Sequence, residues 1–233
     1  MRISQTTLSV CTTQGLELPS PPRGCRPITL RSYTSVRGHL VATLKGATRL
    51  IGFESRLEWD AALLFLAHPK VVDLVEQPFR VGYENRQGKP RHHVFDYLVE
   101  TSDGTRIAVA VKPAERARKI GLVEDLSIIA KQVPDELADQ VSLFTDEHYE
   151  PWQAWNAHHL HACRKTADPH ADCILARTVE QLHGAVSLGD LVVMTGLGGR
   201  GYKAAIRGIF SGVLAQMTAG RIGPKSTVMR GGA

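Results

Sequence analysis

The middle of the chain most constrains what it can fold into, because segments rich in β-branched residues alternate there with short polar turns. The turns are NRQG at 85–88 and SDG at 102–104, and residues of this kind connect neighbouring strands. The segments that they separate predict three strands that meander. These segments are VVDLVEQPFRVGY at 71–83, HHVFDYLVET at 92–101 and RIAVAVK at 106–112.

Helical periods flank the predicted strands on both sides. Apolar residues keep helical spacing from Phe53 to Ala67, and Pro69 closes the run, as expected at the end of a helix. A second helical period covers 115–133 and precedes a short strand at 141–145. The order helix, three strands, helix, strand predicts an α/β fold whose mixed sheet is flanked by helices.

The last third of the chain predicts a second, mostly helical unit. Residues 174–185 and 200–214 have helical spacing, and Ser187 is a suitable N-cap for a short helix at 188–195. Three short helices before a hairpin or loop at 215–230 form the outline of a winged helix. The alternative is a helical packing domain whose surface happens to be basic. The predicted units are an irregular arm at 1–25, a main domain at 26–168 and a C-terminal domain at 169–233.

Charge is distributed unevenly along the chain. Residues 1–50 contain seven basic residues and one acidic residue, residues 51–190 contain 15 and 22, and residues 191–233 contain six and none. Basic ends can neutralise phosphates, whereas an acidic centre is suited to a divalent cation. The alternative is an ordinary solvated surface. The predicted DNA contacts of the C-terminal unit are Arg200, Lys203, Arg207, Arg221 and Lys225.

Three residues on neighbouring predicted elements form a candidate catalytic set. Glu58 lies on the first helix, Asp96 in the second strand and Lys112 at the end of the third strand. Metal-dependent phosphodiester hydrolysis needs carboxylates that hold the ion and a cation near the attacking water. The order carboxylate, aspartate, then lysine on a following strand is the pattern of the PD-(D/E)XK nucleases. Any one of the three residues alone is more often a surface charge.

Longer strings carry the same three residues. They are FESRLEWDAALLFLAHPKVVDLVEQPFRVGY at 53–83, HVFDYLVETSDG at 93–104, IAVAVKP at 107–113 and SLFTDEHYEPWQAWNAHHL at 142–160. Together these strings resemble the TnsA-type endonuclease subunits of heteromeric bacterial transposases, over about residues 26–233. The resemblance implies a restriction-endonuclease-like α/β nuclease domain followed by a small winged-helix-like C-terminal domain.

The resemblance also implies a role for each residue of the candidate set. Glu58 matches the helix carboxylate, Asp96 the metal-bridging aspartate and Lys112 the catalytic lysine. The implied cofactor is Mg²⁺, with Mn²⁺ as an alternative, held by Glu58, Asp96, the backbone carbonyl of Val111 and waters.

One position departs from the family pattern. Ala110 stands where the family has Gln or Glu, and alanine has no ligand oxygen. Glu54 lies one helical turn before Glu58 and is a candidate replacement ligand, since residues four apart on a helix are neighbours. The alternative is that Glu54 is an exposed acid favoured by the N-terminus of the helix.

The function implied by the resemblance is a Mg²⁺-dependent DNA endonuclease that hydrolyses one strand at transposon ends. Its partners would be double-stranded DNA, a DDE-type transposase subunit and a transposition ATPase regulator. Two other functions stay open. One is a catalytically weak DNA-binding and assembly subunit of the transposition complex, which Ala110 favours. The other is a stand-alone restriction-like nuclease.

Two tryptophans precede the C-terminal unit. Trp152 and Trp155 lie three residues apart on a predicted helix, with Leu160 near the same face. This spacing predicts side chains packed in the core rather than a platform for base stacking.

Composition bears on the class of protein. No stretch approaches the roughly 18 uninterrupted apolar residues of a membrane span, and the N-terminal sequence lacks a continuous apolar segment. The four cysteines are scattered without a CxxC pair, which argues against a disulfide framework. We expect a cytoplasmic protein with no membrane partner.

Overall fold

The computed structural model describes residues 18–29 and 35–232, and the chain has a mixed α/β fold. The strands of its central sheet are β3 (Val71–Glu76), β6 (Tyr97–Thr101), β7 (Arg106–Val111) and β8 (Gln140–Phe144). They lie in the order β3-β6-β7-β8, and β8 runs parallel to β7 whereas the other neighbours are antiparallel. The predicted mixed sheet is therefore present.

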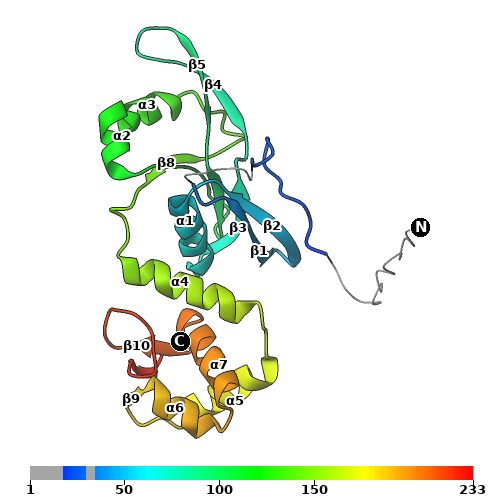
Figure 1. Cartoon of the computed structure of the whole chain (residues 1–233), viewed down its shortest axis with the longest axis vertical. Helices are drawn as coiled ribbons and strands as arrows, with labels where there is room; N and C mark the ends of the chain where they lie inside the picture. Colours follow the sequence, from blue (N-terminus) through cyan, green and yellow to red (C-terminus); the bar gives the residue numbers. More distant parts are fainter. Residues whose placement is uncertain (1–17, 30–34, 233) are drawn as a thin grey trace, which may run out of the picture.

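Two hairpins accompany this sheet. They are formed by β1 (Gly38–Leu44) with β2 (Ala47–Phe53), and by β4 (Arg80–Glu84) with β5 (Pro90–Val94). The prediction of one strand at 71–83 was wrong, because the chain turns at Gln77, whose φ is +39°, and Pro78 has no N–H to donate. The segment at 92–101 is also divided, between β5 and β6. The β4–β5 ribbon projects away from the sheet (Figure 1).

Helices cover both faces of the sheet. They are α1 (Arg56–Ala67) on one face, and α2 (Ala114–Ile120) and α3 (Leu122–Ile129) on the other, whereas α4 (Pro151–Arg164) packs against α1. The prediction of α1 is confirmed, and the side chain of Ser55 caps it by accepting a hydrogen bond from the N–H of Glu58 at 3.1 Å. The prediction of one helix at 115–133 was wrong. Gly121 divides it with a left-handed φ of +66°, a conformation that glycine adopts without steric cost.

The side chains of β7 alternate between two apolar clusters, as the period of a strand requires. Val109 and Val111 belong to the cluster that includes α1, whereas Ala108 and Ala110 belong to a second cluster with α2 and α3. The sheet is thus packed on both faces, and the C-terminal end of β7 emerges between α1 and α2.

The C-terminal unit contains three helices and a small sheet. Its elements are α5 (Pro169–Glu180), β9 (Val186–Ser187), α6 (Leu188–Thr195), α7 (Gly199–Phe210), β10 (Leu214–Gln216) and β11 (Thr227–Arg230). The sheet is antiparallel, in the order β10-β11-β9. The predictions of a helix capped by Ser187 and of a C-terminal hairpin are confirmed. The first helix begins at Pro169, before its predicted start, because Asp168 caps it.

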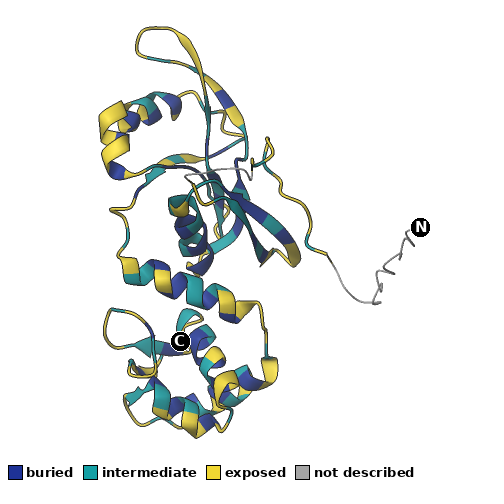
Figure 2. Cartoon of the chain, viewed as in Figure 1, coloured by how far each residue is buried: buried dark blue, intermediate teal, exposed yellow. Residues whose placement is uncertain are grey.

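One apolar cluster runs through both units. It contains Leu63 of α1, Leu160 and Cys163 of α4, Leu175 of α5 and Ile206 of α7. Helix α4 lies between the upper and lower parts of the molecule (Figure 1), and buried residues lie on both sides of it (Figure 2). The two predicted units therefore share a core across the boundary predicted at residue 168.

The described part of the N-terminal arm lies along β2 and β3. Ser20 forms a parallel bridge with Arg49, and the N–H of Cys25 donates to the carbonyl of Gln77 at 2.8 Å. Arg23 pairs with Asp73 at 2.7 Å. Residues 1–17 of the predicted irregular arm lie outside the described residues. Among the described residues, no helix has the length and apolar character that crossing a membrane requires.

Candidate functional site

Glu58, Asp96 and Lys112 lie close together, although three different elements carry them. Glu58 is in the first turn of α1, Asp96 is the residue before β6, and Lys112 follows β7 directly. Burial, followed by the negative charge of Glu58, raises the pKa of Asp96, and the positive charge of Lys112 acts to lower the pKa of both carboxyls. The fold thus brings the three predicted catalytic residues within electrostatic reach of one another.

The carboxylate of Asp96 is held in place by the edge of the next strand. Its Oδ2 accepts a hydrogen bond from the backbone N–H of Val111 at 2.6 Å, and its own N–H donates to the carbonyl of Val109 at 3.0 Å. Burial, followed by the nearby charge of Glu58, raises the pKa of Asp96 to about 7. The ionised form of this carboxyl is therefore costly in the absence of a nearby cation.

Glu58 is oriented by the residues that begin α1. Its Oε2 accepts a hydrogen bond from the N–H of Glu54 at 2.6 Å, and its Oε1 accepts one from the hydroxyl of Ser55 at 3.0 Å. Burial raises the pKa of Glu58 as well. Within residues 18–29 and 35–232, neither Glu58 nor Asp96 forms an ion pair. Two desolvated, electrostatically coupled carboxylates that form no ion pair fit the oxygen preference of Mg²⁺.

Ala110 lies beside Asp96 in the sheet. The register pairs Tyr97 with Val109, and its continuation places Ala110 opposite Asp96. Ala110 is 1% exposed and adds no oxygen. The described residues contain no group of three or more His, Cys, Asp or Glu side chains that could hold a metal ion. An ion at this site would use two carboxylates, and waters and backbone oxygens such as the Val111 carbonyl would complete its shell.

Glu54 is engaged by an arginine from the N-terminal arm. Its carboxylate accepts hydrogen bonds from Arg26, and from Nε2 of Gln77 at 3.1 Å. Burial alone would raise the pKa of Glu54, but the hydrogen bond and charge of Arg26 outweigh it and keep that pKa below its ordinary value. Glu54 precedes the N-cap of α1 and is only partly exposed, so it is not the exposed first-turn acid of the alternative interpretation.

Gln77 is a residue of the site that the sequence did not reveal. It is 3% exposed, it has a left-handed φ of +39°, and its backbone N–H donates to the carbonyl of Asp96 at 2.8 Å. Its Oε1 has no hydrogen-bond partner among the described atoms. Strained, incompletely bonded residues often lie at functional sites. No sequence signal marks this conformation, because a residue before proline normally has an extended backbone.

A cleft of about 500 Å³ has two of the three predicted catalytic residues, Glu58 and Lys112, in its wall, together with Val111. A second cleft of about 480 Å³ adjoins it and reaches the C-terminal unit at Arg221. The two clefts share four lining residues, Arg56, Asp60, Asp146 and Tyr149.

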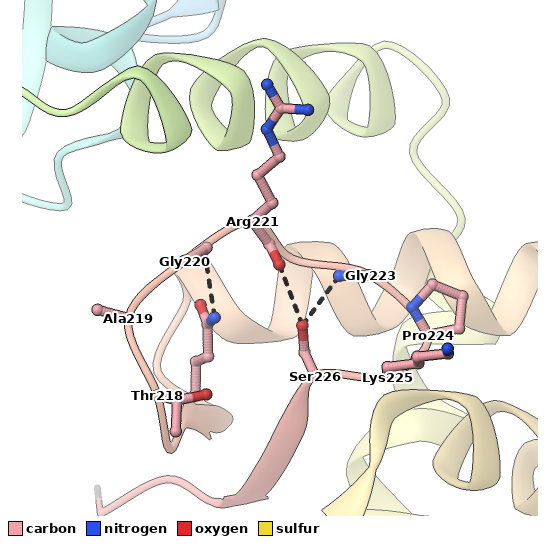
Figure 3. A pocket seen from close by; sticks show the side chains of 9 residues that line it. Thr218, Ala219, Gly220, Arg221, Gly223, Pro224, Lys225 and Ser226 are labelled. Carbon is pink, nitrogen blue, oxygen red and sulfur yellow. Dashed lines mark hydrogen bonds between the residues drawn. The ribbon is translucent and has the colours of Figure 1, made fainter.

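The five predicted DNA-contacting cations have different surroundings. Arg200 pairs with Asp168 at 2.7 Å and Arg207 with Asp172 at 2.6 Å, so both support the packing of α7 against α5. Lys203 donates to the hydroxyl of Thr166 at 3.3 Å. Arg221 and Lys225 lie on the loop between β10 and β11 (Figure 3), and neither forms an ion pair with a described residue.

The tryptophan prediction is correct only in part. Leu160 is in the core, as predicted, whereas Trp155 is 38% exposed and its ring lies 5.7 Å from the guanidinium of Arg221. Helix α4 packs against α1 and α7, and Trp155 is one of its exposed residues.

No protein-family model matches this chain, and comparison with the curated proteins also gives no match.

Proposed function

We propose that the chain is a Mg²⁺-dependent DNA endonuclease, the nuclease subunit of a heteromeric transposase that cuts one strand at each transposon end. The observation that carries this proposal is that Glu58, Asp96 and Lys112 lie within electrostatic reach of one another, with Glu58 and Lys112 in the wall of one cleft. Mn²⁺ is an alternative cofactor. The proposed partners are duplex DNA, a DDE-type transposase subunit that processes the other strand, and an ATPase regulator of transposition.

Each residue has a distinct task in this proposal. A divalent cation bound by Glu58, Asp96 and the Val111 carbonyl would polarise the scissile phosphate and acidify a bound water. Asp96 supplies a carboxylate that the backbone of Val111 fixes in position. Glu58 is oriented by Ser55 and by the N–H of Glu54. Lys112 supplies positive charge at the end of β7, where the attacking water or the phosphate would lie.

The architecture supports the proposal at a coarser level. A helix that carries a carboxylate precedes a mixed sheet whose central strands carry the aspartate and the lysine, as in restriction-endonuclease-like folds. Three helices with a three-stranded antiparallel sheet are compatible with a winged-helix-like domain. We therefore propose a nuclease domain at 26–168 and a DNA-binding domain at 169–233, in which Arg221 and Lys225 remain candidate DNA contacts.

The direct test is a nicking assay on end-containing DNA with Mg²⁺ or Mn²⁺, in the presence and absence of the partner transposase. The wild-type protein should nick one strand, and Asp96→Asn should not. Glu115→Gln removes an exposed acid on α2 and should have no effect. Equal nicking by wild type and Asp96→Asn would assign the activity to another site or to a contaminant.

Ala110 favours a second function, a catalytically weak DNA-binding and assembly subunit, because the site lacks a third side-chain ligand. This function predicts binding to DNA and to the transposase without nicking under any metal condition. Nicking without a transposase, in a genome that encodes none nearby, would instead favour a stand-alone restriction-like nuclease.

A further inference from the structure

The loop between β10 and β11 is clamped onto α4 by one buried side chain. Asn156 is 5% exposed, its Nδ2 donates to the carbonyl of Gly220 at 3.0 Å, and its Oδ1 accepts from the N–H of Ile222 at 2.9 Å. These two hydrogen bonds fix the backbone on both sides of Arg221. The buried amide of Asn156, with both its nitrogen and its oxygen hydrogen-bonded, therefore fixes the backbone position of the exposed Arg221.

The side chain of Arg221 is presented to the second cleft. Its guanidinium lies over the ring of Trp155, 5.7 Å from the centroid, and a cation–π contact orients a guanidinium without neutralising its charge. Figure 3 shows Arg221 extending from the loop toward α4, away from Lys225. Arg200 and Arg207 of the same unit are paired with aspartates, whereas Arg221 has no acidic partner in the described part of the chain.

The two acidic residues of this cleft are hydrogen-bonded to groups other than Arg221. Asp60 accepts hydrogen bonds from Arg56 and Tyr149, and its Oδ1 lies 2.7 Å from Nε2 of His158. Asp146 accepts from the N–H of Ala114 at 2.7 Å, at the start of α2. Neither acid forms an ion pair with Arg221, so the guanidinium of Arg221 remains available to a ligand.

The cleft of Arg221 also adjoins the cleft over Lys112, with four lining residues in common. A chain of phosphates that passes over Lys112 would continue past Tyr149 and Trp155 to Arg221. We propose that Arg221, held by Asn156 and Trp155, binds a backbone phosphate of the DNA strand that is cleaved, a contact that rests on the proposed endonuclease function. Asn156 and Trp155 are positioning residues, and Arg221 makes the contact.

The first experiment measures affinity for a short blunt DNA duplex at several salt concentrations. Arg221→Ala should lower the affinity several-fold and reduce the slope of log K against log salt by about one, because one phosphate contact is lost. Arg177→Ala is the matched control, since Arg177 is exposed on α5 and forms no ion pair with a described residue. It should change neither quantity.

A second experiment tests positioning. Asn156→Leu keeps the charge of Arg221 and a similar side-chain volume but removes both clamping hydrogen bonds. It should reduce the slope of log K against log salt as Arg221→Ala does. The double variant should show no further reduction. A thermal melt checks that the variant folds. If it does not fold, tryptophan fluorescence gives an independent readout: adding duplex should change the emission of wild type and of Trp152→Phe, but not of Trp155→Phe.

The outcomes separate this inference from the proposed function. If wild type binds duplex and Arg221→Ala keeps the full affinity and slope, the phosphate contact is wrong while the endonuclease function stands. If both arginine variants lose the same slope, the effect is general charge and the inference fails. If Arg221→Ala alone loses one contact but wild type never nicks DNA, the phosphate contact stands, whereas its assignment to a cleaved strand fails together with the endonuclease function. A wild type that binds no duplex at low salt rejects the inference.

Discussion

The carboxylate of Asp96 accepts a hydrogen bond from the backbone N–H of Val111 at 2.6 Å, across the ends of two neighbouring strands. Val111 immediately precedes Lys112, so this single contact ties the acidic and the basic member of the candidate set to each other. Strand pairing fixes the backbone positions of Asp96 and Lys112 relative to each other. This arrangement makes the site sensitive to conservative changes.

Asp96→Asn should abolish metal-dependent nicking, by at least about 100-fold, because it removes the charge that would bind the ion while keeping the shape. The fold and DNA binding should be retained, since the amide oxygen can still accept from Val111. Lys112→Ala should lose nearly as much activity. Nicking rates and duplex affinity are measured on the same preparations. Residual nicking near the wild-type level in Asp96→Asn would contradict the proposed role.

The raised pKa of Asp96, about 7, predicts that stability depends on pH in the absence of metal. The folded-state pKa lies above that of the unfolded chain, so the folded state binds the proton more tightly. Its contribution to stability is full below the unfolded-state pKa of about 4, and is lost as the pH rises through about 7. Urea unfolding with a chelator should show this loss, and Asp96→Asn should flatten the curve between these values.

Metal should reverse this trend. Since Mg²⁺ and a proton compete for Asp96, the Mg²⁺-induced increase in melting temperature should grow between about pH 6 and pH 8. Asp96→Asn should show little increase at any pH. An equal Mg²⁺ effect in wild type and variant would place the ion elsewhere.

Ala110→Gln should increase Mg²⁺ affinity and nicking at low Mg²⁺, because position 110 lies opposite Asp96. The structure adds a cost that the sequence did not predict. Ala110 is packed in the apolar cluster with Ala117, so the larger polar side chain should destabilise the fold by about 1–3 kcal/mol. Titration of nicking against Mg²⁺ and a urea melt measure the two effects. Unchanged Mg²⁺ dependence with reduced stability would show that residue 110 does not reach the ion.

Removal of residues 170–233 should do more than weaken DNA binding. The deletion exposes the face of α4 that carries Leu160 and Cys163, and each large apolar side chain returned to water costs about 1.5–3 kcal/mol. The full chain should unfold in one transition, whereas the truncated chain should melt earlier or aggregate. Calorimetry checks both. Two separate transitions in the full chain would contradict a shared core.

Much of the fold could be predicted because it depends on local signals. Helix α1 has a clear period, an N-cap at Ser55 and a stop near Pro69, and α6 has its cap at Ser187. The errors came from tertiary effects. Gly121 divides a helical period without interrupting its apolar pattern, and the turn at Gln77 requires a backbone that its neighbour Pro78 disfavours. The β1–β2 hairpin was missed because its residues mix polar and apolar types without regular alternation.

The candidate site, too, could be predicted only in part from the sequence. Chemistry and order along the chain selected Glu58, Asp96 and Lys112, and the structure brings these residues together. The sequence could not predict that the carboxylate of Glu54 is paired with Arg26, because the two residues are far apart along the chain. The same holds for Arg200 and Arg207, whose acidic partners lie on another helix or at its cap. Sequence supplies candidate charges, and only tertiary contacts show which of them remain available.

The position of α4 between the two parts of the molecule has a mechanical consequence. Because its apolar residues belong to one continuous core, closing the lower unit on a ligand would disrupt that core, and we expect the two parts to stay fixed relative to each other. A duplex that touched both Lys112 and Arg221 would therefore have to adapt its own curvature to the protein. Bending a site of a few helical turns by 40–90° costs roughly 1–6 kcal/mol and depends on base-step flexibility. Such a rigid frame would favour deformable sequences next to the cut even where no side chain reads a base.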